Sequence, residues 1–215
     1  MTRSVAPVVT DVPDFLTTQE FFQWGPAGRY HERWHLLDGL PVQMPTLPIE
    51  QSVLHKEIAW VIAAHLHHQE SDARVGTKVA LTPAGSDRNI YVACVGVTCE
   101  PKRPTRFVHK PVVIAEIVNP QNYKLVHVGV AMCKLIPSLQ EIVVLDGLHV
   151  CAAIHRRKER GEWDEPDYVF RDETLELRSL RVQVPLNRLY QCVDLAAQQV
   201  MDDPGEPDYW TEPAR

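Results

Sequence analysis

The sequence is poor in paired cysteines, in excess positive charge and in long apolar runs, and each shortage excludes a class of protein. Its 215 residues include five cysteines, and none of them forms a Cys-x-x-Cys pair. We therefore expect no disulfide framework, and a reducing compartment. The net charge of −6 argues against a general nucleic-acid coat protein. No apolar run approaches the roughly 18 residues of a membrane helix. The N-terminus also lacks the apolar core of a signal peptide, so we expect a cytoplasmic protein with no membrane contact.

The chain contains enough apolar sequence for one sizeable core, since 45% of its residues are hydrophobic. We expect a loose arm over 1–14, one domain over 15–200 and an acidic, proline-rich tail over 201–215. Asp-Gly turns at 38–39 and 146–147 predict hairpins. Apolar spacing predicts helices over 50–68, 123–135 and 186–200. Strands are expected at 75–81, 90–98, 111–118, 141–145, 148–155, 167–170, 174–177 and 181–184. This order indicates an α/β (α+β) fold, a sheet with helices packed on it.

One carboxylate stands out because it lies inside an apolar strand. The run PVVIAEIVNP over 111–120 places Glu116 in its middle. A buried carboxylate is costly unless it is paired or binds a cation. Two neighbouring strands that each point an acid into one cleft make a magnesium site for phosphodiester hydrolysis. In this sequence the preceding strand, NIYVACVGVTCE over 89–100, offers the thiol of Cys94 where the partner acid would stand.

Five segments carry a resemblance to a known family. They are RWHLLDGLPVQM at 33–44, NIYVACVGVTCE at 89–100, VVIAEIVNP at 112–120, LIPSLQEIVVLD at 135–146 and DETLELRSLRVQVPLNRLY at 172–190. In their order and spacing the stretch from Thr17 to about Leu195 resembles the Uma-two family of restriction endonucleases, in the PD-(D/E)xK nuclease superfamily. The resemblance implies a central mixed sheet flanked by helices, with an N-terminal hairpin and C-terminal β segments. It also implies metal-dependent DNA hydrolysis and a homodimer.

Carried over residue by residue, the family's site keeps only Glu116. The resemblance places Cys94 where the family has an aspartate and His35 where the hairpin has a glutamate. Three further positions also depart: the early helical histidine is about Gln51, the serine after the second strand is Asn119, and the helical lysine falls near Gly129 or Val130. The pattern is that of a dismantled hydrolytic site. It favours a non-catalytic module that binds protein or nucleic acid and needs no cofactor.

Two alternatives from other classes stay open at this point. In an active DNA endonuclease, Glu116 would hold magnesium or manganese and Lys134 or Lys124 would replace the missing lysine. In a zinc-stabilised variant, His35, Cys94 and Glu116 would converge on one ion, because zinc accepts all three ligand types. For nucleic-acid contact the candidates are the basic residues before the Glu116 strand, which are Lys102, Arg103, Arg106 and Lys110.

Overall fold

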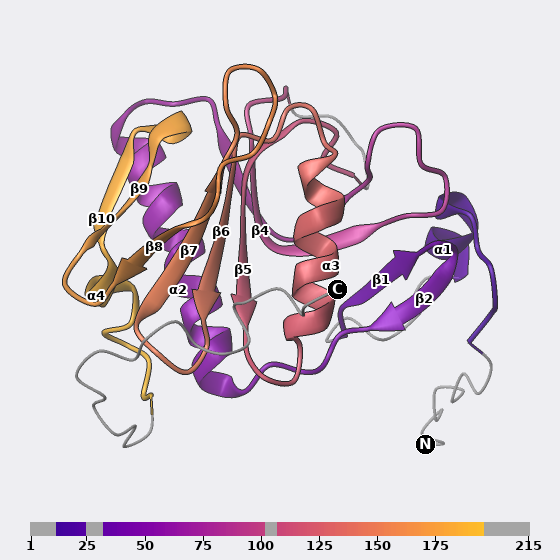
Figure 1. The fold of residues 1–215 in the computed structure, drawn as a ribbon, viewed down its shortest axis with the longest axis horizontal. Helices are drawn as coiled ribbons and strands as arrows, with labels where there is room; N and C mark the ends of the chain where they lie inside the picture. The colour runs from indigo at the N-terminus through magenta and orange to yellow at the C-terminus, as the bar shows by residue number, and fades with distance from the viewer. Residues whose placement is uncertain (1–11, 25–31, 102–106, 196–215) are drawn as a thin grey trace, which may run out of the picture.

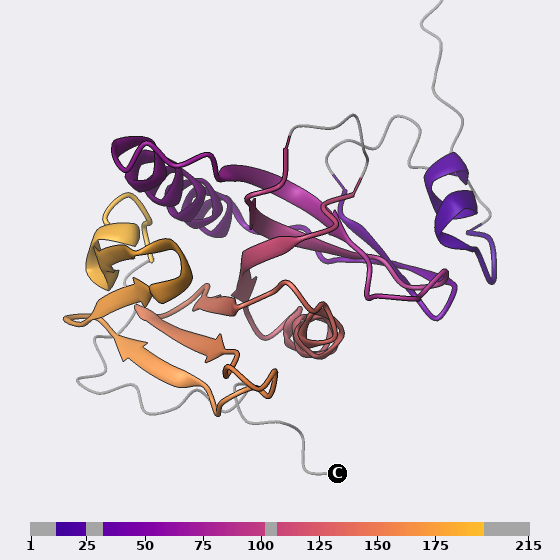
Figure 2. The ribbon, with the colours of Figure 1, turned by 90° about the horizontal axis from the view of Figure 1, so that it is seen from above.

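The fold is built on a six-stranded mixed sheet with helices on both faces (Figures 1 and 2). The structure is a computed structural model, and it describes residues 12–24, 32–101 and 107–195. The strand order is β3-β4-β5-β6-β7-β8, and every neighbouring pair is antiparallel except β5 and β6, which are parallel. The sheet strands are β3 (Arg74–Leu81), β4 (Tyr91–Thr98), β5 (Pro111–Val118), β6 (Glu141–Asp146), β7 (Cys151–Arg156) and β8 (Asp167–Phe170).

The two main helices cover opposite faces of this sheet (Figure 2). Helix α2 (Ile49–His68) packs against the odd-numbered apolar residues of β5, among them Val113 and Ile117. Helix α3 (Tyr123–Lys134) connects β5 to β6 and packs with Ile114 and Val118. Since side chains alternate along a strand, Glu116 belongs to the α3 face.

Two hairpins flank the sheet. The N-terminal hairpin of β1 (Trp34–Leu37) and β2 (Leu40–Gln43) lies beside α1 (Thr18–Trp24), and Leu36 bridges to Ile90 at the start of β4. The second hairpin contains β9 (Thr174–Leu177), the 3-10 turn η1 (Arg178–Leu180) and β10 (Val182–Pro185), and is followed by α4 (Leu186–Leu189). It packs on the α2 side, where its leucines and valines enter the same core.

The expected fold class and the central mixed sheet are confirmed, as are the hairpin at Asp38-Gly39, the antiparallel pair β6–β7 across the turn at 146–147 and the C-terminal β segments. Two expectations are wrong. In the described part of the range predicted as a helix over 186–200, which ends at residue 195, the helix spans only Leu186–Leu189, because the Tyr190 hydroxyl bonds to the Asp146 and Cys151 carbonyls and ties the chain to the sheet. Strand β7 begins at Cys151, not at 148, because the Asp146 carboxylate accepts the amides of residues 148 and 149 and widens the turn. The tail over 201–215 and most of the arm lie outside the described residues.

Candidate functional site

Strands β4 and β5 stop pairing as they reach Cys94 and Glu116. Their ladder runs from Thr98 opposite Pro111 to Val95 opposite Ala115. The Cys94 amide then donates to Glu116 Oε1 at 2.9 Å, so a side chain takes the place of a strand partner. On the other edge of β4, Lys78 interrupts the β3 ladder with a left-handed backbone at φ 51°. The Cys94 carbonyl accepts a hydrogen bond from His55 Nε2 at 2.6 Å. Both backbone groups of Cys94 are therefore bonded to side chains, at a point where the sheet opens.

Arg33 supplies the positive charge that the buried Glu116 requires. Its Nη1 lies 3.0 Å from Glu116 Oε2 and 2.6 Å from Cys94 Sγ. The Glu116 side chain is fully buried and that of Arg33 is 10% exposed, so this ion pair lies largely out of water. Burial, the largest single effect, lowers the pKa of Arg33, but the Glu116 charge, the nearby Cys94 and Tyr91 and the hydrogen bond to Glu116 together raise that pKa above its ordinary value. The guanidinium therefore stays charged.

The Cys94 thiol lies beside this ion pair, and the residue is buried, with 3% of its surface exposed. Burial, followed by the Glu116 charge, raises the pKa of Cys94 to about 12. At neutral pH the sulfur is therefore a protonated thiol that accepts the Arg33 hydrogen bond. A thiol in this state is a poor nucleophile and a poor metal ligand, since both roles require the thiolate.

His35 is buried beside this pair but bonds elsewhere. Its ring stacks on Tyr91, with centroids 4.5 Å apart and planes 9° from parallel. The Nδ1 atom accepts the Val92 amide at 3.0 Å, which assigns the ring proton to Nε2. Burial, and after it the Arg33 charge, lowers the pKa of His35 well below its ordinary value. His35 is thus a neutral ring that supports Tyr91 and the start of β4.

Other positions that the resemblance assigns to the hydrolytic site also have structural partners. A Cβ atom added to Gly129 would lie 1.9 Å from Tyr91 Cε2, so the tyrosine ring occupies the space that a side chain on α3 would need. Asn119 Nδ2 donates to Gln51 Oε1 at 2.6 Å, and both residues are buried. These contacts tie α2 to the end of β5 and close α3 onto β4.

Three of the sequence-predicted basic residues, Lys110, Lys124 and Lys134, lie in the described part of the chain, and their contacts there are with other groups than Glu116. Lys134 ends α3 with its ammonium 5.9 Å from the Trp163 ring centroid. The Lys124 ammonium lies 5.8 Å from the Tyr123 ring centroid. Lys110 is exposed, and its amide donates to Glu100. Lys102, Arg103 and Arg106 lie outside the described residues. The cation bonded to Glu116 is Arg33, the first residue of the motif over 33–44, for which the sequence predicted no role at the site. The signal that could have found it is the need of Glu116 for a cationic partner.

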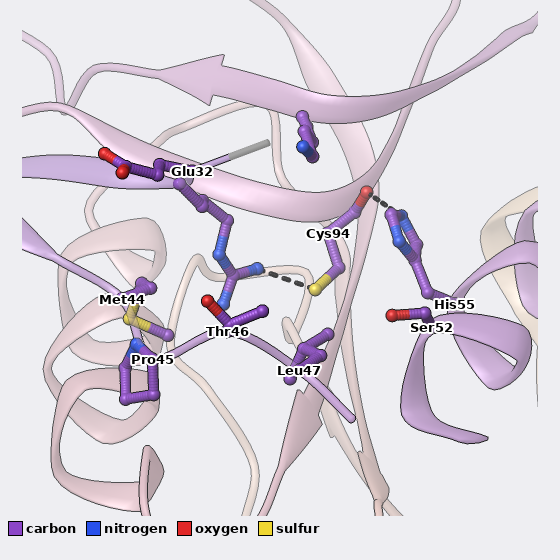
Figure 3. Close-up of a pocket in the computed structure, with 10 residues that line it drawn as sticks. Glu32, Met44, Pro45, Thr46, Leu47, Ser52, His55 and Cys94 are labelled. Atoms are coloured by element: carbon purple, nitrogen blue, oxygen red, sulfur yellow. Dashed lines mark hydrogen bonds between the residues drawn. The ribbon is translucent and has the colours of Figure 1, made fainter. Parts of the chain in front are cut away.

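A pocket of about 130 Å³ opens beside Arg33 and Cys94 (Figure 3). Figure 3 shows the Cys94 carbonyl bonded to His55 on one side of the pocket, while its sulfur faces the other. The pocket is bounded by the hairpin, the segment before α2, α2 itself and strands β3 and β4. Its lining residues are Glu32, Arg33, Met44, Pro45, Thr46, Leu47, Ser52, His55, Lys78 and Cys94.

The residues at this site do not fit a magnesium ion. Magnesium requires near-octahedral oxygen ligation. Here one Glu116 oxygen accepts the Cys94 amide, the other accepts Arg33, and the neighbouring side chain is a thiol. Within 12–24, 32–101 and 107–195, no group of three or more His, Cys, Asp or Glu side chains is placed to hold a metal ion. Zinc ligation by His35, Cys94 and Glu116 stays a prediction.

Comparison with known proteins identifies the fold. The structure is similar to a solved structure from Anabaena variabilis ATCC 29413, described as a "putative nuclease belonging to DUF820", with a TM-score of 0.67 and 17% sequence identity. The similarity covers 81% of this chain and 97% of that chain. No protein-family model matches the sequence, and no curated protein matches it. The chain therefore has a nuclease-like fold. None of the helices in its described part has both the length and the apolar character to span a bilayer.

Proposed function

We propose that this protein is a non-catalytic binding module built on a nuclease-like fold, in which Arg33 stands in for the catalytic metal. The observation that carries the proposal is the buried contact of the Arg33 guanidinium with both Glu116 and Cys94. A hydrolytic centre of this kind needs a cation that polarises phosphate and activates water. Arg33 provides the charge but has no exchangeable ligand position. It therefore stabilises the fold without generating a nucleophile.

The surface of α3 supports a binding role. Val128 and Leu135 are 45% and 67% exposed and lie seven positions apart, which places them on one side of the helix. Together with Met132 they border a shallow hollow of about 590 Å³, closed on its other side by the loop over 83–89. Exposed apolar side chains that border a hollow are a usual feature of interaction surfaces. The partner is a second copy of this chain, another protein or DNA.

A cleavage assay tests the loss of catalysis. Supercoiled plasmid is incubated with magnesium and then with manganese, using the full chain and the Glu116→Gln variant, which removes the carboxylate but keeps an acceptor for the Cys94 amide. We expect both proteins to leave the plasmid supercoiled. Cutting by the full chain that Glu116→Gln abolishes would overturn the proposal in favour of a metal-dependent DNA endonuclease.

A metal titration tests how Arg33 acts. Manganese is titrated calorimetrically into the full chain and into a double variant, Arg33→Ala with Cys94→Asp, which removes the guanidinium and supplies a second carboxylate beside Glu116. We expect saturable binding only in the double variant, because two acids then face one cleft. Equal binding by the full chain would show that Arg33 does not exclude a metal. Circular dichroism of each protein checks that the fold is kept.

A further inference from the structure

The pocket beside Arg33 contains positive charge and hydrogen-bond donors beyond those that hold Glu116. Arg33 and Lys78 both line it, together with His55 and Ser52. The Arg33 Nη2 atom is buried and has no hydrogen-bond partner among the residues that the structure describes. A buried donor without an acceptor costs free energy comparable to a lost hydrogen bond, and more when the group is charged. Such a donor indicates that a ligand or a water completes the site.

The start of α2 adds a second feature that favours an anion. The 20-residue helix begins at Ile49, and its N-cap, Pro48, gives no side-chain hydrogen bond to the first turn. The first backbone amides of a helix have no partners within the helix and carry a partial positive charge. Leu47 and Ser52 lie on either side of this helix start and line the pocket, whereas the first-turn residues 49–51, which include the acidic Glu50, do not line it. The helix start therefore contributes the Ser52 side chain and the positive end of its dipole, and not a set of backbone amides in the pocket.

Lys78 lines the pocket from a strained backbone position. Its φ of 51° lies in the left-handed region, which is unfavourable for a residue with a long side chain. The β3 ladder is interrupted at this residue, between Thr77 paired with Val95 and Val79 paired with Ala93. Backbone strain of this kind is concentrated at ligand-binding sites. Here the strained residue is a lysine that lines the pocket.

We propose that this pocket binds a phosphate-type oxyanion, the phosphomonoester group of a small molecule, between Arg33, Lys78 and Ser52. The inference rests on the proposed function, because it requires Arg33 to remain in the site. A pocket of about 130 Å³ accommodates one such group with a short organic portion against Met44 and Leu47. Glu32 also lines the pocket, with its carboxylate accepting the indole N–H of Trp34 at 2.8 Å. The Glu32 carboxylate offsets part of the positive charge of Arg33 and Lys78 in the lining. Selection of the ligand would therefore depend on directed hydrogen bonds and not on an excess of positive charge.

Calorimetric titration with inorganic phosphate tests this site in the full chain. The buffer contains EDTA, and chloride at matched ionic strength is the reference. We expect saturable binding of phosphate that chloride does not compete away. Lys78→Gln should weaken it by about tenfold or more, since a charge-assisted hydrogen bond is lost. Lys56→Gln removes an exposed charge from α2, outside the pocket lining, and should change the affinity less than about twofold.

Two results would overturn the site: phosphate that binds no better than chloride, or equal effects of Lys78→Gln and Lys56→Gln. The double variant Arg33→Met with Glu116→Gln, which removes both charges of the buried pair together, should abolish binding. A variant that keeps its fold and still binds phosphate at full affinity also contradicts the assignment. These outcomes are separate from plasmid cleavage: cutting refutes the proposed function, whereas absent phosphate binding in EDTA refutes this site alone.

A competition experiment identifies the source of the phosphate. Glycerol phosphate, a 5′-phosphorylated oligonucleotide and the same oligonucleotide with a 5′-hydroxyl are compared as competitors of inorganic phosphate. Competition by glycerol phosphate supports a free small-molecule ligand. If only the 5′-phosphorylated oligonucleotide competes, the oxyanion is a nucleic-acid end and the small-molecule assignment is wrong. Equal competition by the two oligonucleotides, with none by glycerol phosphate, would point to the phosphodiester backbone and would overturn the monoester assignment.

Discussion

Replacing Arg33 by methionine should destabilise the fold strongly, because it leaves a fully buried carboxylate without its cation. The Glu116 side chain is 0% exposed and the Arg33 side chain 10% exposed, and their atoms are 3.0 Å apart. Removing one partner of a buried ion pair costs about 3–5 kcal/mol. Against the roughly 5–15 kcal/mol that stabilise a typical domain, this is a large part of the free energy of unfolding.

The double variant separates lost charge compensation from lost packing. In Arg33→Met with Glu116→Gln no buried charge remains, and the glutamine oxygen can still accept the Cys94 amide. We expect the double variant to recover at least about 2 kcal/mol of the unfolding free energy lost in Arg33→Met. The control is Arg171→Met, at an exposed arginine in the turn after β8, which should change stability by less than about 0.5 kcal/mol.

Urea unfolding followed by tryptophan fluorescence measures these free energies. The chain has five tryptophans, and Trp34 directly follows Arg33. If Arg33→Met lowers the free energy of unfolding by less than about 1 kcal/mol, the Arg33–Glu116 ion pair does not behave as a buried pair in solution. A double variant no more stable than Arg33→Met would assign the loss to packing of the arginine stem, and would refute the electrostatic explanation.

Three further predictions follow from single contacts. In the native protein, iodoacetamide should modify the exposed Cys99 and leave Cys94 intact until urea unfolds the chain, because Cys94 is buried and burial raises its pKa to about 12. Peptide mass spectrometry follows the modification of each cysteine, and equal rates for Cys99 and Cys94 would contradict the prediction. Gly129→Ala should lower the free energy of unfolding by about 1–3 kcal/mol, because the added methyl group would clash with the Tyr91 ring. In a helix without such a clash, Gly→Ala raises the free energy of unfolding by about 0.5–1 kcal/mol. A gain in stability would therefore refute the contact with Tyr91. Burial lowers the pKa of His155 to about 3, so on acidification the unfolded state binds the proton before the folded state does. The free energy of unfolding should therefore fall by up to about 1.4 kcal/mol per pH unit from pH 6.5 towards pH 3. In urea titrations at several pH values His155→Gln should flatten that slope, and an unchanged slope would assign it to other groups.

The strands and the two long helices could be predicted because their signals are local. Apolar runs such as PVVIAEIVNP and the helical spacing over 50–68 gave bounds within one or two residues of β5 and α2. The Asp38-Gly39 turn has both residues at positive φ, as its residue types indicate. The helix over 186–200 failed for a non-local reason, since Tyr190 bonds to carbonyls that lie 39 and 44 positions earlier in the chain. Spacing alone contains no information on such a contact.

The need for a partner to Glu116 could be predicted, but its identity could not. Arg33 is 83 positions away in sequence from Glu116. It reaches the carboxylate because the N-terminal hairpin docks through backbone bonds between Leu36 and Ile90, just before β4. That docking is a tertiary event, and a lysine from α3 was an equally reasonable expectation from sequence. The structure instead ends α3 beside Trp163, with Lys134 at the aromatic ring.

The proposal of a non-catalytic site is supported by contacts that occupy several positions where the resemblance implies catalytic residues. A guanidinium provides the positive charge that a buried acid needs, the Tyr91 ring fills the space over Gly129, and an amide pair joins Gln51 to Asn119. Such contacts stabilise the folded chain, and under this proposal the site is part of the core. Creating a hydrolytic centre would then require removing Arg33, adding an acid at Cys94 and displacing Tyr91 together. Any one of these changes alone leaves a buried charge, a cavity or a clash, which is why a single substitution should not restore cleavage.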